Sequence, residues 1–327
     1  MQIEIYNMTV LNDKLNISLE AVCDSFSSLL WDIEYYKCGA FEVYIAASPR
    51  NIEIFQTGRI VGRDDDKEHF GLIESVELET DAEDGDYLII KGRFLMCLLE
   101  RRIIYPTLNF TSQTSYGAIV QKAVESNALT SGNRLIPGLK LGEIQGACWS
   151  QTTKLQVSYE NLMEWVYTIC EKIGGTANIR LSKIADEQYE MIFELLQGTD
   201  RSILQKINPH IIFSDRYNNL LSFTYFTDTS VKRNFAYVLG KGESEQRKRT
   251  TCFTNSEPAL LDRYEVYVDA KDISDEEQIA NETKPISEIE YEELLKEKGK
   301  QNLVPTKTKS ESQIAVQSTQ FQYGVDY

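Results

Sequence analysis

Residues 58–102 read GRIVGRDDDKEHFGLIESVELETDAEDGDYLIIKGRFLMCLLERR. They predict a strand, an acidic turn, a second strand and, after a Gly-Arg step, a short helix. Val76 and Leu78 alternate with glutamates, which is the period-2 pattern of a strand with one apolar face. Asp84-Gly85 then supplies a hairpin turn, because glycine adopts a positive φ without steric cost.

The return strand and the helix complete this stretch. Residues 87–90 are apolar on both faces, which predicts a strand covered on both sides. Gly92 is expected to let the backbone turn sharply, and the helix that follows carries one apolar stripe of Phe94, Leu95, Leu98 and Leu99. No side chain here is arranged for catalysis. The stretch therefore predicts one corner of a small β-barrel that carries a helix.

The rest of the first 200 residues divides into a strand-rich part and an α+β part. Phe41, Val43 and Ile45 alternate with other residues and predict a strand. Residues 127–146 are rich in Gly, Asn and Ser and predict a long loop. Apolar spacing then indicates a helix with Ser158 as its N-cap and Gly174-Gly175 at its end. A β-hairpin is expected over residues 177–196.

The last third of the chain again predicts strands, together with one helix. The expected strands cover residues 220–227, 234–239, 263–269 and 313–323. The acidic stretch 276–300 predicts a helix in which Ser287 and Glu290 form a capping box. These patterns give an α+β fold that is mainly β.

The composition restricts the classes of protein to be considered. The chain has 327 residues, and 50 acidic against 34 basic residues give a net charge of −16. Proteins that grip nucleic acid need an excess of Lys and Arg, so specific nucleic-acid binding is not expected. The acidic surplus fits equally a soluble surface or a surface that DNA passes without adhering.

Targeting and cysteine usage point to a protein made in the cytoplasm. The sequence has no apolar run near 20 residues and starts without a basic or apolar leader segment, so neither a membrane span nor a secretory signal is expected. The six cysteines stand singly and predict reduced thiols that fill the core. With only two histidines there is little to build a zinc site, and we expect no metal and no cofactor.

Two charged clusters are candidate binding sites. Asp64, Asp65 and Asp66, followed by Glu68 and His69, carry oxygen ligands that suit Ca²⁺ or Mg²⁺. The cluster lacks the regular ligand spacing and the turn glycine of a calcium loop. A solvated hairpin loop is therefore the favoured interpretation.

The second cluster lies in GKGESEQRKRT, residues 240–250. Lys241-Gly242 does not meet the spacing of a phosphate-binding loop. The run Arg247, Lys248 and Arg249 has the charge to contact phosphate or an acidic partner, but an exposed, solvated loop is favoured.

Enzymatic chemistry finds little support in the residues. His69 and His210 are the only histidines, and no nucleophile elbow or zinc-protease motif is present. Paired carboxylates of a glycoside hydrolase remain open, because such residues are distant in sequence. No catalytic residue is predicted.

Aromatic residues gather in two places and leave two interpretations open. Trp31, Tyr35 and Tyr36 lie early in the chain, and a late group comprises Phe223, Tyr225 and Phe226. Aromatics are enriched at subunit interfaces, and they also fill barrel cores. Both interpretations can be true of one strand, because one of its faces can fill the core while the other forms an interface.

In this order and spacing the segments resemble siphophage and prophage tail-hub proteins (baseplate hub, tail-associated) of the ReqiPepy-phage type. The matching pieces cover nearly the whole chain and are residues 27–39, FEVYIA, GRIVGRDDDKEHFGLIESVEL, LIIKGRFLMCLLERRII, the helix ending IGG, and LLDRYEVYVDA. Residues 262–269 are similar to a late Arg-x-Glu strand motif of the family. Each piece is weak alone, and their order carries the resemblance.

The resemblance implies a structural role and brings no catalytic residues. It implies two β-barrel-like modules that flank an α/β insertion, with expected boundaries at 1–105, 106–200 and 201–327. Hubs of this kind form a ring, usually a homotrimer, at the distal end of the tail tube in the baseplate or tip. The expected partners are further copies of the chain, the distal tail, tail tube and tape-measure proteins, and tail fibre or tip proteins. Family members often continue past a segment like FQYGVDY with an Asp-Leu-Gly-Asp-like motif and another strand, so either the last element is missing here or this member ends early.

Two other functions compete with this one. A tail-tip peptidoglycan hydrolase or peptidase would clear cell walls in a zymogram. A module that recognises a host receptor or glycan would bind cells, and aromatic platforms with carboxylates suit such binding.

Overall fold

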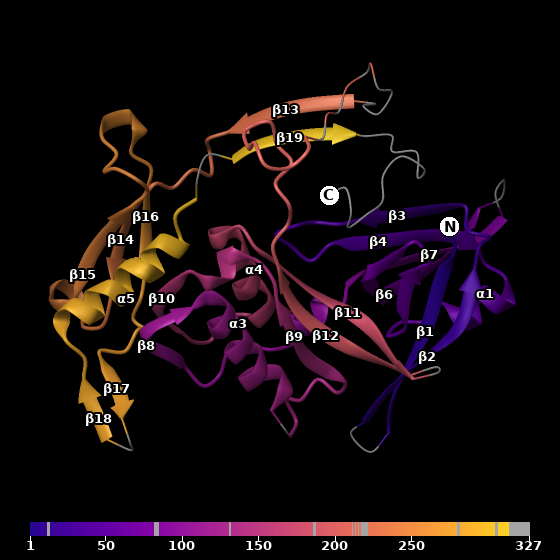
Figure 1. Cartoon of the computed structure of the whole chain (residues 1–327), viewed down its shortest axis with the longest axis horizontal. Coiled ribbons are helices and arrows are strands. Elements are labelled where there is room, and N and C mark those ends of the chain that lie inside the picture. Colours follow the sequence, from indigo (N-terminus) through magenta and orange to yellow (C-terminus); the bar gives the residue numbers. More distant parts are fainter. Residues whose placement is uncertain are drawn as a thin grey trace. The chain divides into compact units, whose positions relative to one another are not determined.

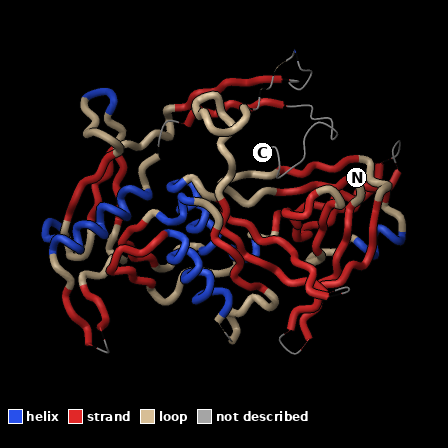
Figure 2. The backbone as a smooth tube through the Cα atoms, in the orientation of Figure 1, coloured by secondary structure: helices blue, strands red, loops and turns tan. Residues whose placement is uncertain are grey.

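The computed structural model describes residues 1–11, 14–81, 85–130, 132–185, 188–210, 212, 214, 216, 222–279, 282–304 and 307–313. The chain is mainly β, with several sheets and a smaller helical part (Figures 1 and 2). The predicted α+β, mainly β fold is therefore confirmed. Two compact units are present: residues 1–108, 114–152 and 158–197 form the first, and residues 109–113, 153–157 and 198–327 the second. No helix of the described ranges is long and apolar enough to cross a membrane.

The first unit is built on a seven-stranded antiparallel sheet in the order β2-β1-β5-β6-β7-β4-β3. Its strands are β1 (Ile3–Leu11), β2 (Lys14–Cys23), β3 (Ser28–Asp32), β4 (Ala40–Ala46), β5 (Ile60–Arg63), β6 (Asp66–Asp81) and β7 (Gly85–Phe94). The short helix α1 (Pro49–Ile54) follows β4 and begins at Ser48, whose hydroxyl accepts a hydrogen bond from the Asn51 N–H.

Alternation along the strands determines the core of this sheet. Phe41, Val43 and Ile45 on β4 are buried, as their spacing predicts, and they pack with Ile3 and Ile5 of β1. The prediction for residues 87–90 holds for one face only. Leu88 and Ile90 are buried, whereas Tyr87 and Ile89 are half-buried.

Gly92 does not make a turn, contrary to the sequence prediction. It lies inside β7, where it pairs with Ile73 on one side and with Phe41 on the other. A Cβ atom at Gly92 would stand 1.9 Å from the carbonyl oxygen of Leu72 and 2.7 Å from the Phe41 ring. The glycine is therefore needed because the neighbouring strand and the Phe41 ring approach its Cα too closely for a side chain, and not because the backbone turns here.

The helix after β7 is shorter than predicted. Phe94 still belongs to β7, and α2 (Cys97–Glu100) has only four residues. Arg102 lies beyond it, and its guanidinium donates to the carbonyl oxygens of Arg134 (2.7 Å) and Leu135 (3.3 Å). Arg102 therefore holds the loop of residues 134–135.

A three-stranded sheet with helices completes the first unit. Its order is β11 (Thr176–Ala185), β12 (Gln188–Leu196) and β9 (Leu139–Ile144), and β9 lies in the stretch predicted to be a loop. The helical elements are α3 (Tyr116–Val124), a π-helix (Glu125–Leu129), a 3₁₀ turn (Ala147–Ser150) and α4 (Leu162–Ile173).

The N-terminus of α4 corrects a second prediction. Asn161, not Ser158, caps the helix, and its Oδ1 accepts from the N–H groups of Met163 (3.1 Å) and Glu164 (3.2 Å). The other end is as predicted, because Gly174 takes the left-handed conformation with φ 74°.

The second unit contains a three-stranded sheet with one covered face. β14 (Phe235–Leu239) lies between antiparallel β15 (Arg249–Phe253) and parallel β16 (Glu265–Asp269). Helix α5 (Glu288–Gln301) packs against this sheet over a core that includes Ala236, Val238, Cys252, Val268 and Leu295. Three two-stranded pairings are β13 (Ser222–Asp228) with β19 (Lys307–Gln313), β17 (Glu276–Ile279) with β18 (Glu282–Pro285), and β8 (Leu108–Ser115) with β10 (Thr152–Val157).

The predicted acidic helix begins later than expected. Residues 276–279 and 282–285 form the β17–β18 ribbon, and α5 starts at Glu288. The capping box is confirmed: the Glu290 N–H donates to the Ser287 hydroxyl, and the Ser287 N–H donates to the Glu290 carboxylate. Residues 314–323, predicted as a last strand, lie outside the described residues.

Candidate functional site

The acidic cluster forms the hairpin between β5 and β6, and Asp66 organises it. Only 4% of Asp66 is exposed. Its Oδ1 accepts from the N–H groups of Glu68 (3.0 Å) and His69 (3.1 Å), and its Oδ2 accepts from the Trp31 indole (3.0 Å). The His69 Nδ1 lies 3.1 Å from Oδ2. Burial acts to raise the pKa of Asp66, but the hydrogen bonds, that of His69 first, hold it below its usual value.

The solvated loop predicted here is correct for two of the three aspartates. Asp64 and Asp65 are exposed; Asp65 pairs with the Arg63 guanidinium (2.8 Å), and Asp64 accepts from the Gln2 N–H (2.7 Å). For Asp66 the prediction is wrong, because its carboxylate is internal and satisfied. No group of three or more His, Cys, Asp and Glu side chains is arranged to hold a metal ion in the described part of the chain. The arrangement is that of a structural hairpin.

The basic run of residues 247–249 makes contacts inside the second unit. The Arg247 side chain is only 9% exposed, and it donates to the Tyr267 hydroxyl (3.0 Å) and the Asp269 carboxylate. Lys248 pairs with Glu288, and Lys241 pairs with Asp275. The structure thus uses this charge to tie β14, β16 and α5 together, and the predicted solvated loop does not describe Arg247.

The two histidines lie in different units and have different surroundings. His69 contacts Asp66, as described above. The His210 Nε2 lies 3.0 Å from the carbonyl oxygen of Gln205, at an exposed position.

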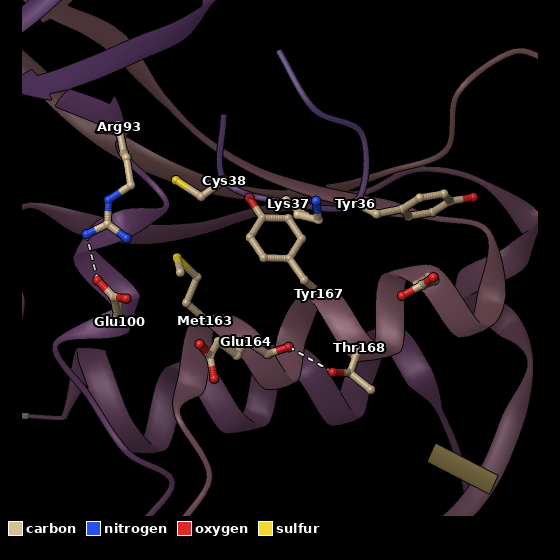
Figure 3. Close-up of a pocket in the computed structure, with 10 residues that line it drawn as sticks. Tyr36, Lys37, Cys38, Arg93, Glu100, Met163, Glu164, Tyr167 and Thr168 are labelled. Carbon is tan, nitrogen blue, oxygen red and sulfur yellow. Dashed lines mark hydrogen bonds and ion pairs between the residues drawn. The ribbon is translucent and has the colours of Figure 1, made fainter. Parts of the chain in front are cut away.

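A cavity of about 350 Å³ opens in the first unit (Figure 3). Its walls come from the segment between β3 and β4, the end of β7, α2 and one face of α4. Arg93 lies at one end, bridging Glu74 (2.8 Å) and Glu100 (2.6 Å). The hydrogen bonds that Arg93 donates to these two carboxylates raise its pKa, so it stays cationic and its charge is compensated.

Cys38 lines this cavity together with Lys37 and Thr168. Burial raises the pKa of the Cys38 thiol to about 11, so it is protonated near neutral pH. Its Sγ donates a hydrogen bond to the carbonyl oxygen of Phe94 (3.3 Å). The cavity therefore holds a protonated thiol beside an arginine whose charge two carboxylates compensate.

Of the early aromatic residues, one fills the core and two are exposed, so the predictions of core and of interface each apply to part of the segment. Trp31 is partly buried and packs against Phe41 (5.7 Å between ring centroids) and Phe94 (5.0 Å). Tyr35 and Tyr36 remain exposed. In the late group Phe226 is 54% exposed, whereas the side chains of Phe223 and Tyr225 lie outside the described residues.

The open face of the β14–β16 sheet is an arrangement that the sequence analysis missed. We call it the aromatic face; it comprises Phe235, Tyr237, Phe253, Tyr267 and Arg263. The Arg263 guanidinium lies 3.5 Å above the Phe235 ring, and the Phe235 and Phe253 rings stack at 6.2 Å. The sequence does carry a signal for it: Phe235 and Tyr237 alternate with Ala236 and Val238, which predicts a strand with one aromatic face.

The family model described as Siphovirus ReqiPepy6 Gp37-like protein matches residues 3–327. No curated protein sequence matches the chain.

Solved structures with similar folds include three tail proteins. They are the prophage tail protein gp18 from Listeria monocytogenes EGD-e (12% identity, TM-score 0.44, 83% of this chain and 72% of that chain), the tail protein from Neisseria meningitidis MC58 (11%, 0.44, 82% and 72%) and the 43 kDa tail protein of prophage MuSo2 from Shewanella oneidensis (11%, 0.43, 84% and 74%).

Proposed function

The chain belongs to the Siphovirus ReqiPepy6 Gp37-like family, as its sequence resemblance predicted, and on this basis we propose that it is a structural protein of a phage or prophage-derived tail. The observation that carries the proposal is the match of the family model from residue 3 to residue 327. A mainly β fold with several sheets is consistent with it.

The specific role that we propose is that of the tail hub. Copies of the chain form a ring, a homotrimer, at the distal end of the tail tube, where the ring joins the tube to the tip and lets DNA pass. Closed rings arise when one surface of each copy contacts a different surface of the next. The partners are the distal tail, tail tube and tape-measure proteins and the tip or fibre proteins. The division at residues 105 and 200 remains part of this proposal.

A non-enzymatic role is supported by the state of the reactive groups. Cys38 is a protonated thiol, Arg93 is neutralised by two carboxylates, and His69 is held by a buried aspartate. Each of these groups makes contacts that stabilise the fold. We therefore propose that the chain acts by assembly in the virion tail.

Self-association tests the ring directly. We expect light scattering or native mass spectrometry to reveal trimers or larger rings of the purified chain, increasing with its concentration, because ring contacts form by mass action. A stable dimer would contradict the proposed ring, since a closed pair leaves no surface for a third copy.

The acidic surplus leads to a second expectation. If the inner face of the ring is negative, DNA passes without adhering. Purified protein should therefore not retard duplex DNA in a gel at physiological salt, whereas a basic protein run beside it should. Retardation in the micromolar range, typical of non-specific DNA binders, or a calculated lumen potential that is neutral or positive, would count against this expectation.

A further inference from the structure

Three arginines lie together on the surface of the first unit. Arg101 and Arg102 directly follow α2, and Arg134 lies in the loop before β9. The Arg102 guanidinium donates to the carbonyl oxygens of Arg134 and Leu135, which brings the two loops together. Arg101 is exposed, and Arg102 and Arg134 are half-buried. Positive charge is thus concentrated on one small area of a chain whose net charge is −16.

No carboxylate compensates this charge in the described part of the chain. None of the three guanidinium groups forms an ion pair there, and the adjacent Glu100 carboxylate is bonded to Arg93 (2.6 Å) instead. Burial, and then the positive charges of Arg134 and Arg101, lower the pKa of Arg102, whereas Arg93 with its two carboxylates has a raised pKa. An anion placed against the three arginines would therefore be attracted by all of them.

Backbone contacts hold two of the three cations in place. The Arg134 guanidinium donates to the carbonyl oxygens of Tyr105 (2.6 Å) and Ile103, and Arg102 is held as described above. A carbonyl oxygen orients a guanidinium without cancelling its charge, and each guanidinium has further N–H donors to offer. The cations are therefore preorganised, and an anionic partner need not order them.

Exposed aromatic and aliphatic side chains border the arginines. Ile103, Tyr105 and Tyr159 are 49%, 53% and 64% exposed, and the two tyrosine rings lie 6.1 Å apart. The Tyr159 N–H donates to the carbonyl oxygen of Ile104 (2.8 Å), and Tyr159 has φ +58°, which is uncommon for a bulky residue. Tyrosine and arginine are enriched at protein interfaces. We call this surface the arginine–tyrosine patch; it comprises Arg101, Arg102, Ile103, Tyr105, Arg134 and Tyr159.

The composition of the patch indicates the chemistry of its partner. A free phosphate or carboxylate ion would leave the apolar area of Ile103 and the tyrosines in water, so a macromolecule fits better. DNA and an anionic membrane are extended charged surfaces, and they would face the whole chain with its net charge of −16. A short acidic segment interacts mainly with charges within the Debye length, which is about 8 Å at physiological ionic strength. A protein segment that combines carboxylates with aliphatic side chains therefore matches the patch.

We propose that the arginine–tyrosine patch binds an acidic segment of a partner protein. Its Asp or Glu carboxylates contact the three arginines, whose planar guanidinium groups suit bidentate pairing with a carboxylate. Its aliphatic side chains cover Ile103 and the two tyrosines. This contact goes beyond the proposed tail role and does not depend on the ring.

The test follows the fluorescence anisotropy of a labelled peptide as the full-length chain is added. The peptide consists of repeated Glu-Leu-Glu units, and we expect saturable binding that weakens as salt is added, because the contacts are ion pairs. A peptide of repeated Gln-Leu-Gln units keeps the leucines and loses the charge, so it should not bind.

Two variants assign the binding to the patch. Arg101→Glu should weaken it about tenfold, because a like charge replaces an attractive one; the Arg101 guanidinium has no hydrogen bond within the described ranges, so this change leaves the fold intact. Tyr159→Asn should weaken it about fivefold through loss of the ring, and asparagine tolerates a positive φ. Arg50→Glu is the matched control, since Arg50 is an exposed arginine of α1 in the same unit, and it should bind like the wild type. Circular dichroism verifies that each variant is folded.

Each contrary outcome overturns a definite part of the proposal. Equal binding by Arg101→Glu and Arg50→Glu would overturn the patch as the site. Equal binding of the two peptides, or no binding of the Glu-Leu-Glu peptide at the highest concentration of the chain, would overturn the recognition of carboxylates. Tighter binding of single-stranded DNA, or of vesicles of phosphatidylglycerol and phosphatidylcholine, would overturn the choice of a protein partner. The tail role and the ring stand or fall separately, by the self-association experiment.

Discussion

Gly92→Ala is expected to destabilise the first unit by about 3 kcal/mol or more, which is at or beyond the upper end of the usual cost of overpacking. The new Cβ would stand 1.9 Å from the Leu72 carbonyl oxygen and 2.7 Å from the Phe41 ring. The first neighbour is backbone of the adjacent strand, and the second is a 2%-exposed core side chain. Neither can move without separating β6 from β7 or displacing the core.

The measurement is urea unfolding followed by tryptophan fluorescence. All three tryptophans, Trp31, Trp149 and Trp165, lie in the first unit, so the signal reports on that unit. Gly85→Ala is the control on the same strand, because a Cβ there meets nothing within 4 Å and only its φ of +81° is unfavourable. The control should cost about 1 kcal/mol. If both variants lost the same free energy of unfolding, the close contacts around Gly92 would not be what excludes a side chain there.

Asp66→Asn is expected to cost about 2–4 kcal/mol, since hydrogen bonds to a buried charge are stronger than neutral ones and an unpaired donor carries a desolvation penalty. The carboxylate oxygens of Asp66 accept from the Trp31 indole and from the Glu68 and His69 N–H groups, with the His69 ring also in contact. An amide keeps one acceptor oxygen and places an NH₂ group where the other accepted. Asp65→Asn is the control, because Asp65 is an exposed partner of Arg63, and it should change stability by about 1 kcal/mol or less.

The pH dependence of this effect has a definite sign. The pKa of Asp66 is lower in the folded chain than its unfolded value near 4, so the folded state binds the proton less tightly. The stabilisation is therefore complete above the unfolded pKa and is lost as the pH falls through the folded pKa. The difference in unfolding free energy between wild type and Asp66→Asn should be constant near neutral pH and shrink below about pH 4. A difference that grows on acidification would contradict the role of the ionised carboxylate.

Local patterns predicted most of the elements correctly. The alternation of Phe41, Val43 and Ile45 is sufficient for β4, because a half-buried strand requires that period. The apolar spacing of α4 and its terminal Gly174 likewise depend on neighbours within a few residues. The Ser287 capping box is a contact between residues three apart and was read directly from the sequence.

The wrong predictions share a physical cause, which is competition between local options. Ser158 and Asn161 are both good N-caps, and only the packing of the segment before α4 selects Asn161. The acidic composition of residues 276–285 suits a helix, but residues 276–279 pair with residues 282–285 as the β17–β18 ribbon. Propensity gives way to tertiary contacts in both places.

The candidate sites were harder to predict from the sequence than the fold was. Three adjacent aspartates look alike in the sequence, and burial separates Asp66 from its exposed neighbours because Trp31 reaches it from 35 residues away. The stacking of Arg263 on Phe235 joins a residue just before β16 to a residue of β14, 28 positions away in the sequence. Such pairs depend on strand order, which local patterns do not encode.

The sequence by itself determined that this chain is mainly β, that its reactive residues form no catalytic motif, and that it belongs with siphovirus Gp37-like proteins. These properties are carried by residue type and short-range spacing. Only the tertiary structure decided that Gly92 is needed because neighbouring atoms approach it closely, that Asp66 is an internal hydrogen-bond acceptor, and that Tyr237, Phe253 and Tyr267 are left exposed on one face of a sheet. Each of those depends on which distant segments pack together, and burial and close contact exist only once the strands have been placed side by side.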